Sequence, residues 1–303
     1  MAFSGSPGRM SRYNEKAEII YSDVVIPDYL ENAAIRQYTD STFENGTTTN
    51  RFIIVEGYNI VKNLNGTMNI YLLNEEKLIK KTTYNDAGVH SYKIDICILN
   101  DADRTPLISY VKKISENNLK VQIQRYTLNS NNEFVTLGDL IEVATTNNYI
   151  SCAQGNNYIS CQYVEGSCTE TALIIKNDFS KTNKVTIYEG PDCPFDKVVW
   201  LNNDIFAFTF QKYNIIRYGI RRVNNDMGLD DINNNYNDAK ILLSNCQKNT
   251  MRTDATRFNS TTFVISCITE SEHQAHIEVV TLTSDGKYNI NSPSSLSPVP
   301  STT

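Results

Sequence analysis

Residues 147–168 read NNYISCAQGNNYISCQYVEGSC, and the hexapeptide NNYISC occurs twice in this stretch, nine residues apart. Each copy is rich in residues that favour strands, and Gly155-Asn156-Asn157 separates the copies with residue types that tolerate the positive φ of a tight turn. If Asn156 and Asn157 form a two-residue turn, paired positions sum to 313 and Cys152 lies opposite Cys161. The stretch therefore predicts a β-hairpin.

Strand-rich runs of this kind recur along the whole chain. The most apolar runs begin at intervals of 56, 51, 47 and 57 residues, and recurrence at such a period is the signature of a repeat architecture. A second strand-like run and a third, more polar one follow each apolar run, and a short run precedes it. The apolar runs are RFIIVEGY from Arg51, LISYVKK from Leu107, YISCQYV from Tyr158, IFAFTFQ from Ile205 and TFVISCI from Thr262; the short preceding runs include AIRQYTD from Ala34, YKIDICIL from Tyr92, NYISCAQ from Asn148 and DKVVWL from Asp196.

Four strands in each repeat, joined by Asn, Asp and Gly turns, are what a propeller blade requires. One such sheet cannot bury both of its faces, so the sheets stack around an axis. The pattern predicts an all-β chain that forms a five-bladed β-propeller of four-stranded antiparallel blades. A β-sandwich with an appended sheet is the alternative, and it is disfavoured because sandwiches do not usually repeat at a fixed interval.

The same pattern predicts the bounds of the domain. We expect residues 1–15 to be a disordered N-terminal segment, residues 16–291 to be a single β-propeller domain, and residues 292–303 to be a Ser/Pro-rich flexible tail. The early run EIIYSDVV, at Glu18–Val25, belongs to no repeat. We therefore expect it to complete the last blade and so to seal the ring.

Over about residues 30–291 these repeats resemble the β-propeller superfold, without the signature of a particular repeat family. The only Trp is Trp200, which Leu201 follows, so the Trp-Asp signature of WD repeats is missing. There is no Gly-Gly pair, as Kelch repeats would have, and Asp231–Asn237 lacks the Gly and Glu of a calcium loop. The resemblance implies an architecture, and a fold does not by itself give a function.

Composition and charge restrict the partners and the compartment. The chain has 303 residues, of which 40% are hydrophobic, and a net charge of −6 with no basic run, so nucleic acid is not an expected partner. No stretch approaches the 18 or so apolar residues of a transmembrane helix. The first residues, MAFSGSPGRM, lack the apolar core of a signal peptide. These features fit either a cytoplasmic protein or a processed or partial form of an extracellular or cell-surface protein.

Seven cysteines raise the questions of disulfides and of metal binding. Directly opposed residues on paired strands have Cβ atoms about 4.5–5.5 Å apart, against about 3.8 Å in a disulfide, so a Cys152–Cys161 bond is within reach. Two buried free thiols are the alternative. Cys152, Cys161 and Cys168 lack the CxxC spacing of a zinc site, so we expect no metal. A disulfide would indicate an oxidising compartment.

Few residues point to catalysis. With three histidines and no Gly-rich phosphate loop, neither a Ser-His-Asp site nor a nucleotide cofactor is expected, and no other cofactor is indicated. Carboxylates on or beside the expected innermost strands could supply the acid and the nucleophile of a glycosidase, although an Asp at the edge of a strand is more often a turn residue or a cap. These carboxylates are Asp95, Asp196, Asp204 and Asp254.

Aromatic side chains offer a second kind of candidate. They could form a platform for a sugar or a peptide, but at the two-residue spacing of a strand they more often pack between sheets. The residues in question are Tyr149, Tyr158, Tyr163, Trp200, Tyr213 and Tyr218.

Three functional hypotheses follow. The first is a non-catalytic recognition module that binds a protein or a glycan, as the head of a surface or secreted protein. The second is a five-bladed glycoside hydrolase, and the third is a cytosolic protein-interaction scaffold. Two or three carboxylates within about 5–10 Å of one another in a pocket would favour the enzyme. A channel mouth lined by Asn, Thr and Tyr without facing carboxylates would exclude it.

Overall fold

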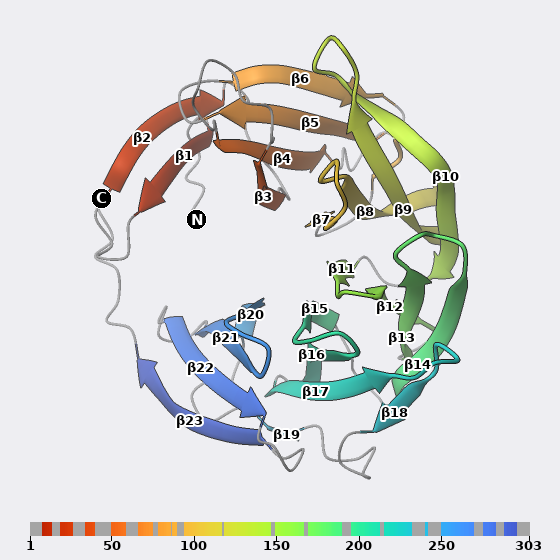
Figure 1. The fold of residues 1–303 in the computed structure, drawn as a ribbon, viewed down its shortest axis with the longest axis vertical. Coiled ribbons are helices and arrows are strands. Elements are labelled where there is room, and N and C mark those ends of the chain that lie inside the picture. Colours follow the sequence, from red (N-terminus) through yellow and green to blue (C-terminus); the bar gives the residue numbers. More distant parts are fainter. Residues whose placement is uncertain are drawn as a thin grey trace. The chain divides into compact units, whose positions relative to one another are not determined.

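The described part of the chain consists of antiparallel β-sheets. The computed structural model describes residues 8–13, 19–26, 34–39, 50–58, 66–74, 78–85, 87–89, 94–116, 118–146, 149–166, 169–189, 195–212, 215–231, 240–241, 250–269, 275–282 and 288–295. These residues form five sheets that each contain four consecutive strands, and one sheet of two strands (Figure 1). The predicted four-stranded antiparallel repeat is thus confirmed. Contacts divide the chain into unit 1, Met1–Ala144, and unit 2, Thr145–Thr303.

Unit 1 contains a hairpin and two larger sheets, each with its strands in chain order. The hairpin consists of β1 (Gly8–Tyr13) and β2 (Ile19–Ile26). The first larger sheet consists of β3 (Ala34–Thr39), β4 (Asn50–Tyr58), β5 (Thr67–Asn74) and β6 (Leu78–Tyr84). The second consists of β7 (Asp95–Ile98), β8 (Pro106–Ser115), β9 (Asn118–Leu128) and β10 (Phe134–Thr145), whose last residue is the first of unit 2.

The expected role of Glu18–Val25 is wrong. Within this run, β2 pairs with β1, from Gly8↔Ile26 to Tyr13↔Ile19, and the last sheet takes all four of its strands from residues 250–295. A local hairpin closes a much shorter loop than a pairing across most of the chain, so it costs less conformational entropy. β1 falls inside the segment 1–15, and the last strand ends at Ser295, four residues past the expected domain end. The division into one domain and a tail stays a prediction, and residues 296–303 lie outside the described residues.

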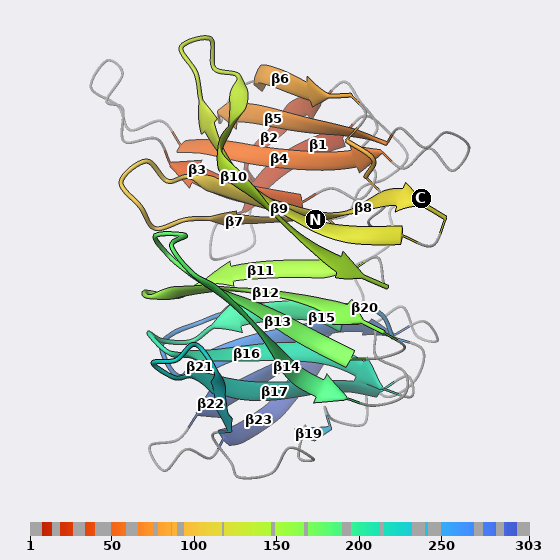
Figure 2. The same ribbon diagram turned by 90° about the vertical axis from the view of Figure 1, so that its right-hand side faces the viewer.

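Unit 2 contains three sheets, again with strands in chain order. Its first sheet consists of β11 (Ile150–Gln154), β12 (Tyr158–Glu165), β13 (Thr169–Lys176) and β14 (Thr182–Glu189). The second consists of β15 (Phe195–Trp200), β16 (Ile205–Lys212), β17 (Ile215–Val223) and β18 (Leu229–Asp231), with β19 (Lys240–Ile241) also paired to β17. The third consists of β20 (Thr250–Arg257), β21 (Thr262–Thr269), β22 (Ala275–Leu282) and β23 (Tyr288–Ser295). The edge strands β11, β15 and β20 follow one another in contact (Figures 1 and 2).

The hairpin that opens unit 2 has the predicted register. Cys152 pairs with Cys161, Ile150 pairs with Tyr163, and the Gly155 amide donates to the Tyr158 carbonyl oxygen at 2.7 Å across the Asn-Asn turn. This turn fixes which side chains of β11 and β12 share a face, because a slip of one residue would exchange the two faces.

The middle sheet of unit 2, β15–β18, is buried on both faces, which explains the near-continuous apolar run of β16. Phe206, Phe208 and Phe210 alternate on one face of β16 and pack with the sheet β11–β14, whereas Ile205 and Ala207 lie on the other face and pack with the sheet β20–β23. In unit 1 the sheets β3–β6 and β7–β10 bury one shared core in the same way.

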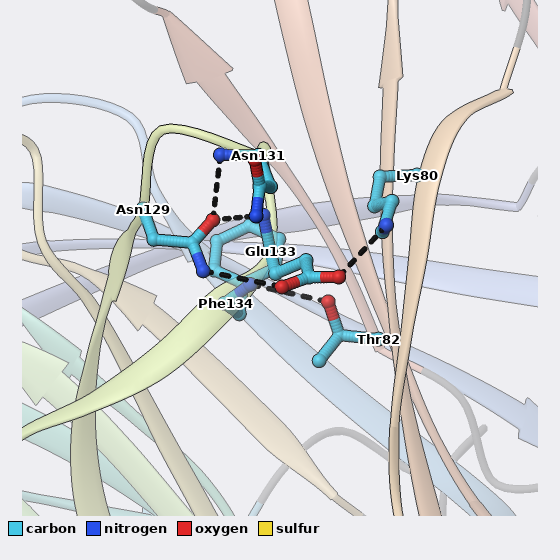
Figure 3. A network of polar contacts seen from close by, with 6 residues as sticks. All are labelled: Lys80, Thr82, Asn129, Asn131, Glu133 and Phe134. Carbon is cyan, nitrogen blue, oxygen red and sulfur yellow. Dashed lines mark hydrogen bonds and ion pairs between the residues drawn. The ribbon is translucent and has the colours of Figure 1, made fainter.

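A polar network fastens the β9–β10 hairpin of unit 1 to β6 (Figure 3). Glu133, in the hairpin turn, forms an ion pair with Lys80 at 2.9 Å and accepts a hydrogen bond from Asn129 Nδ2 at 3.2 Å. The Phe134 amide donates to Thr82 Oγ1 at 3.1 Å. Lys80 and Asn129 donate hydrogen bonds to the Glu133 carboxylate and so lower its pKa.

Candidate binding face

Three exposed turns of unit 2 form a row, which we call the turn row. It consists of the β11–β12 turn at Gly155–Asn157, the β15–β16 turn at Asn202–Asp204 and the β20–β21 turn at Phe258–Thr261. Side-chain amides link successive turns, since Asn156 Nδ2 donates to Asn203 Oδ1 and Asn202 Nδ2 donates to the Ser260 carbonyl oxygen at 3.5 Å. One continuous polar surface therefore crosses three sheets.

Further hydrogen bonds brace each turn. Asn202 Oδ1 accepts from the Ile205 amide at 3.2 Å, and Asn259 Oδ1 accepts from the Thr261 amide at 2.9 Å. Asn177 reaches from the β13–β14 turn and donates through Nδ2 to the Asn156 carbonyl oxygen at 2.7 Å. Short Asn side chains that bond to nearby backbone hold turns in one conformation, so the surface is ordered before any ligand arrives.

Gly155 lets the first turn pack closely on Trp200. A Cβ atom at this position would lie 2.6 Å from Cε3 of the buried Trp200, which is closer than real Cβ contacts. The glycine therefore lets the backbone of the β11–β12 turn rest directly on the Trp200 ring, and it brings this turn against the strand that leads into the next one.

Phe258 stands out on the turn row because its side chain is 76% exposed. Among the side chains that the structure describes in unit 2, no other large apolar one is exposed. The Phe258 amide donates to the Thr262 carbonyl oxygen at 2.9 Å, so the ring projects from a closed hairpin end. Burying such a ring is worth about 1.5–3 kcal/mol, and this gain is available to a ligand.

The four predicted carboxylates do not share one environment. Asp95 in β7 of unit 1 is buried, pairs with Arg36 at 2.9 Å and accepts from the Ile96 amide at 3.0 Å, so it ties β7 to β3. Asp204 lies in the turn row and pairs with Arg222 at 3.2 Å. Asp196 lies in β15 and Asp254 in β20, and their side chains are outside the described residues.

The distance along β15 separates two of these carboxylates. Asp196 lies near the start of the strand, and about 13 Å of strand separates it from Trp200; Leu201 and the turn that carries Asp204 follow. A glycosidase needs its two carboxyl groups within about 5–10 Å. The side chain of Asp196 lies outside the described residues, so a pairing of Asp196 with Asp204 stays a prediction.

Most of the predicted aromatic platform is core. Tyr163, Trp200 and Tyr218 are buried, and Tyr158 packs against the cluster around Trp200, as the packing alternative predicts. Burial and the nearby Glu165 raise the pKa of Tyr163, so its hydroxyl stays protonated. Tyr149 is half-buried, and Tyr213 lies outside the described residues.

Cys152 and Cys161 form a disulfide with an S–S distance of 2.03 Å and a Cα–Cα distance of 4.1 Å. The short Cα–Cα distance is that of a non-hydrogen-bonded pair, where opposed side chains come closest. The alternative of two free thiols is thus wrong for this pair. Both residues are buried, so the bond fastens the edge strand β11 to β12 beneath the first turn of the row.

Metal ligands and membrane segments give no further candidate. Within the described residues, no group of three or more His, Cys, Asp or Glu side chains could hold a metal ion. The sequence also gathers acidic residues and histidines just before and within β22: Glu270, Glu272 and His273 lie outside the described residues, and His276 is described by its backbone alone. No helix in the described part of the chain is long and apolar enough to cross a membrane.

The sequence predicted the turn at Gly155–Asn157 as a hairpin end but did not point to a binding role for it, and Phe258 was not a candidate. The available signal was a large aromatic residue directly before Asn259-Ser260, where the chain leaves β20. An aromatic residue at a turn is not covered by a neighbouring sheet, as one within a strand is.

Comparison of the whole chain with known proteins shows a likeness in fold. No family model matches the chain, and no curated protein matches it in sequence. Among solved structures, AofleA from Arthrobotrys oligospora is similar with a TM-score of 0.51 and 9% identity, over 89% of this chain and 72% of that one. This chain resembles the β-propeller proteins. At such identity the likeness concerns the fold alone.

Two further solved structures cover much of the chain at lower scores. Cobalt-substituted ACO from Synechocystis has a TM-score of 0.47 and 9% identity, over 96% of this chain and 68% of that one. A glycoside hydrolase family 43 arabinoxylan arabinofuranohydrolase from Bacillus subtilis has a TM-score of 0.40 and 9% identity, over 90% and 74%.

Proposed function

We propose that the chain is a five-bladed β-propeller that acts as a non-catalytic recognition module and binds a protein or a glycan through the turn row. The observation that carries the proposal is the exposed Phe258 ring on a braced turn, within a row of three hydrogen-bonded turns.

The five blades of this proposal are the five sheets of four consecutive strands. Each sheet of unit 2 packs against the next, and the middle one buries both faces, which is the arrangement that stacked blades require. The similarity to AofleA extends over 89% of this chain and thus includes both units.

The turn row suits recognition because it is rigid and polar and has one apolar anchor. A preformed surface loses little conformational entropy on binding, so more of the contact energy appears as affinity. Aromatic anchors that stand on such surfaces contribute a large share of binding energy. The turn row also lies at the ends of strands, where functional residues are commonly carried by loops on a rigid scaffold.

The disulfide supports a place for this module outside a reducing cytosol. Disulfides persist in oxidising compartments and are rare where glutathione keeps thiols reduced. We therefore favour the surface or secreted form of the recognition hypothesis over the cytosolic scaffold.

Binding of the labelled chain to an extract of the cells that make it, fixed on a surface, tests the proposal. We expect Phe258→Ala to reduce the bound fraction about tenfold, because the anchor ring is lost. Leu140→Ala is the matched control, since Leu140 is 45% exposed on β10, in unit 1 and outside the turn row. Equal binding by the wild type and Phe258→Ala would contradict the proposal.

A further inference from the structure

We infer that the turn row binds a neutral carbohydrate of two or more sugar units, with Phe258 as the stacking platform. The inference rests on the proposed recognition function and names the ligand class of that same site. Four features of the turn row carry it: its apolar area, its charge, its free hydrogen-bonding groups and its length.

The apolar area of the turn row is that of a single ring. A stable protein interface buries about 800 Å² on each partner and has several apolar or aromatic anchors at its centre. In the described part of unit 2, Phe258 is the only exposed large apolar side chain. One flat ring matches the C–H face of one sugar, whose hydroxyl groups then point outward to a polar surround.

The charges around the turn row largely offset one another. The one carboxylate of the row, Asp204, pairs with Arg222 at 3.2 Å. Arg257, next to Phe258, is partly engaged, since its Nε donates to the Asn259 carbonyl oxygen at 3.3 Å. An anionic ligand would call for a cluster of unpaired cations, and a cationic ligand for an unpaired carboxylate. Neither is present on the described turn row, so a neutral ligand fits.

The free polar groups of the turn row are amides. Asn203 receives the hydrogen bond from Asn156 on Oδ1, which leaves its Nδ2 as a donor toward solvent. Asn157 is exposed, and its side-chain amide has no hydrogen-bond partner among the described residues. An amide offers donors and an acceptor in one plane, which suits adjacent sugar hydroxyls because each hydroxyl both donates and accepts.

The length of the turn row sets the size of the ligand. Its three turns belong to three successive sheets, with Phe258 in the turn of the third sheet and Asn157 in the turn of the first. A sugar stacked on Phe258 lies at one end of the turn row, and the amide of Asn157 lies at the other end. A second or third sugar unit extends along the row toward Asn203 and Asn157, so an oligosaccharide gains contacts that a monosaccharide lacks.

The test is an array of neutral oligosaccharides, followed by titration calorimetry with the one that binds best. The protein should be made in a host without N-glycosylation, because Asn259-Ser260-Thr261 is an acceptor sequon and a glycan there would lie beside the ring. We expect Phe258→Ala to weaken binding about tenfold and Phe258→Trp to retain it, since the larger ring still stacks. An array without any neutral ligand above background, or full binding by Phe258→Ala, would overturn the inference.

Two further measurements test the amide contacts and the neutrality of the ligand. Asn203→Ala should weaken binding severalfold, whereas Leu140→Ala in unit 1 should leave it unchanged. The dissociation constant should stay nearly constant between about 0.05 and 0.5 M salt, because a neutral ligand gains nothing from charges that salt screens. Binding that weakens steadily with salt would assign the ligand to a charged class and overturn the inference.

Treatment of the cell extract distinguishes failure of the inference from failure of the proposed function. Periodate cleaves vicinal diols of sugars, so it should remove the Phe258-dependent binding, and protease treatment of the extract should leave the glycan able to bind. Phe258-dependent binding that survives periodate and is lost on proteolysis overturns the carbohydrate and keeps the recognition function. Binding that does not depend on Phe258 overturns both.

Discussion

Phe258 and Phe208 belong to neighbouring sheets, but one ring is exposed and the other is buried in the core. Phe258 is 76% exposed, whereas Phe208 is 1% exposed and stacks with Phe210 at a ring-centroid distance of 5.8 Å. The carbon of the Arg221 guanidinium lies 5.5 Å from the Phe208 ring centroid, so this ring is covered by charge as well as by apolar side chains.

This contrast predicts that the same substitution to alanine has a large effect on stability at Phe208 and a small one at Phe258. Phe208→Ala should lower the free energy of unfolding by about 3–5 kcal/mol, because it leaves a cavity in the core. Phe258→Ala should change it by less than about 0.5 kcal/mol, as surface substitutions generally do. Urea unfolding followed by far-ultraviolet circular dichroism measures both. A large loss of stability in Phe258→Ala would show that the ring is structural.

Gly219 in β17 allows the Phe208 ring to lie against the backbone. A Cβ at this position would lie 2.3 Å from Phe208 Cζ, so Gly219→Ala forces the ring to move. We expect it to cost about 1–3 kcal/mol of stability, as overpacking does. In a Phe208→Leu background the added methyl meets a smaller side chain, so its cost should fall. A double-mutant cycle measures this coupling, and strictly additive effects would contradict the contact.

At the scale of elements, the β9–β10 hairpin makes the stability of the protein depend on pH through Glu133 in its turn. The pKa of Glu133 lies below its ordinary value because Lys80 and Asn129 donate hydrogen bonds to its carboxylate. Its contribution to stability is present above the ordinary pKa and is lost as the pH falls through the lowered one. Wild type should therefore lose more stability between pH 7 and pH 3 than Glu133→Gln does. Urea midpoints at the two pH values test this, and an equal loss would contradict it.

The disulfide acts on the hairpin β11–β12. Closing a loop of this length is worth about 2–3 kcal/mol of stability in the chain-entropy description. We expect the Cys152→Ala/Cys161→Ala double variant to lose about that amount and to exchange the amide protons of β11 faster. Hydrogen exchange by mass spectrometry measures the second effect, and a non-reduced digest should contain the two cysteine peptides linked. Separate peptides in protein purified from its native source would contradict the bond.

Prediction from sequence succeeded for elements with strong alternation and failed where tertiary context decides. The register of β11 and β12 followed from one Asn-Asn turn, and the pairing of Cys152 with Cys161 followed from the register. β17 pairs with the two short strands β18 and β19. β18, at Leu229–Asp231, is too short and polar to stand out in a sequence. The exposure of Phe258 depends on what surrounds a turn, which no local pattern encodes.

At the scale of the whole molecule, the proposal is one ring of five blades. Antiparallel sheets with two buried faces are stable only when neighbours cover them, and a closed ring supplies neighbours to all of them. An experimental structure with five four-stranded sheets around one axis would support the proposal. Separate sheet packings in the two units would contradict it.

Recognition through the turn row is the central claim, and the most direct test is a titration of the wild type and Phe258→Ala with the best-bound oligosaccharide of a neutral glycan array. Both proteins should have the same unfolding midpoint, so a difference in affinity reports the binding face alone. We predict that wild type binds and that loss of the Phe258 ring weakens binding about tenfold. Identical dissociation constants for the two proteins would contradict the account.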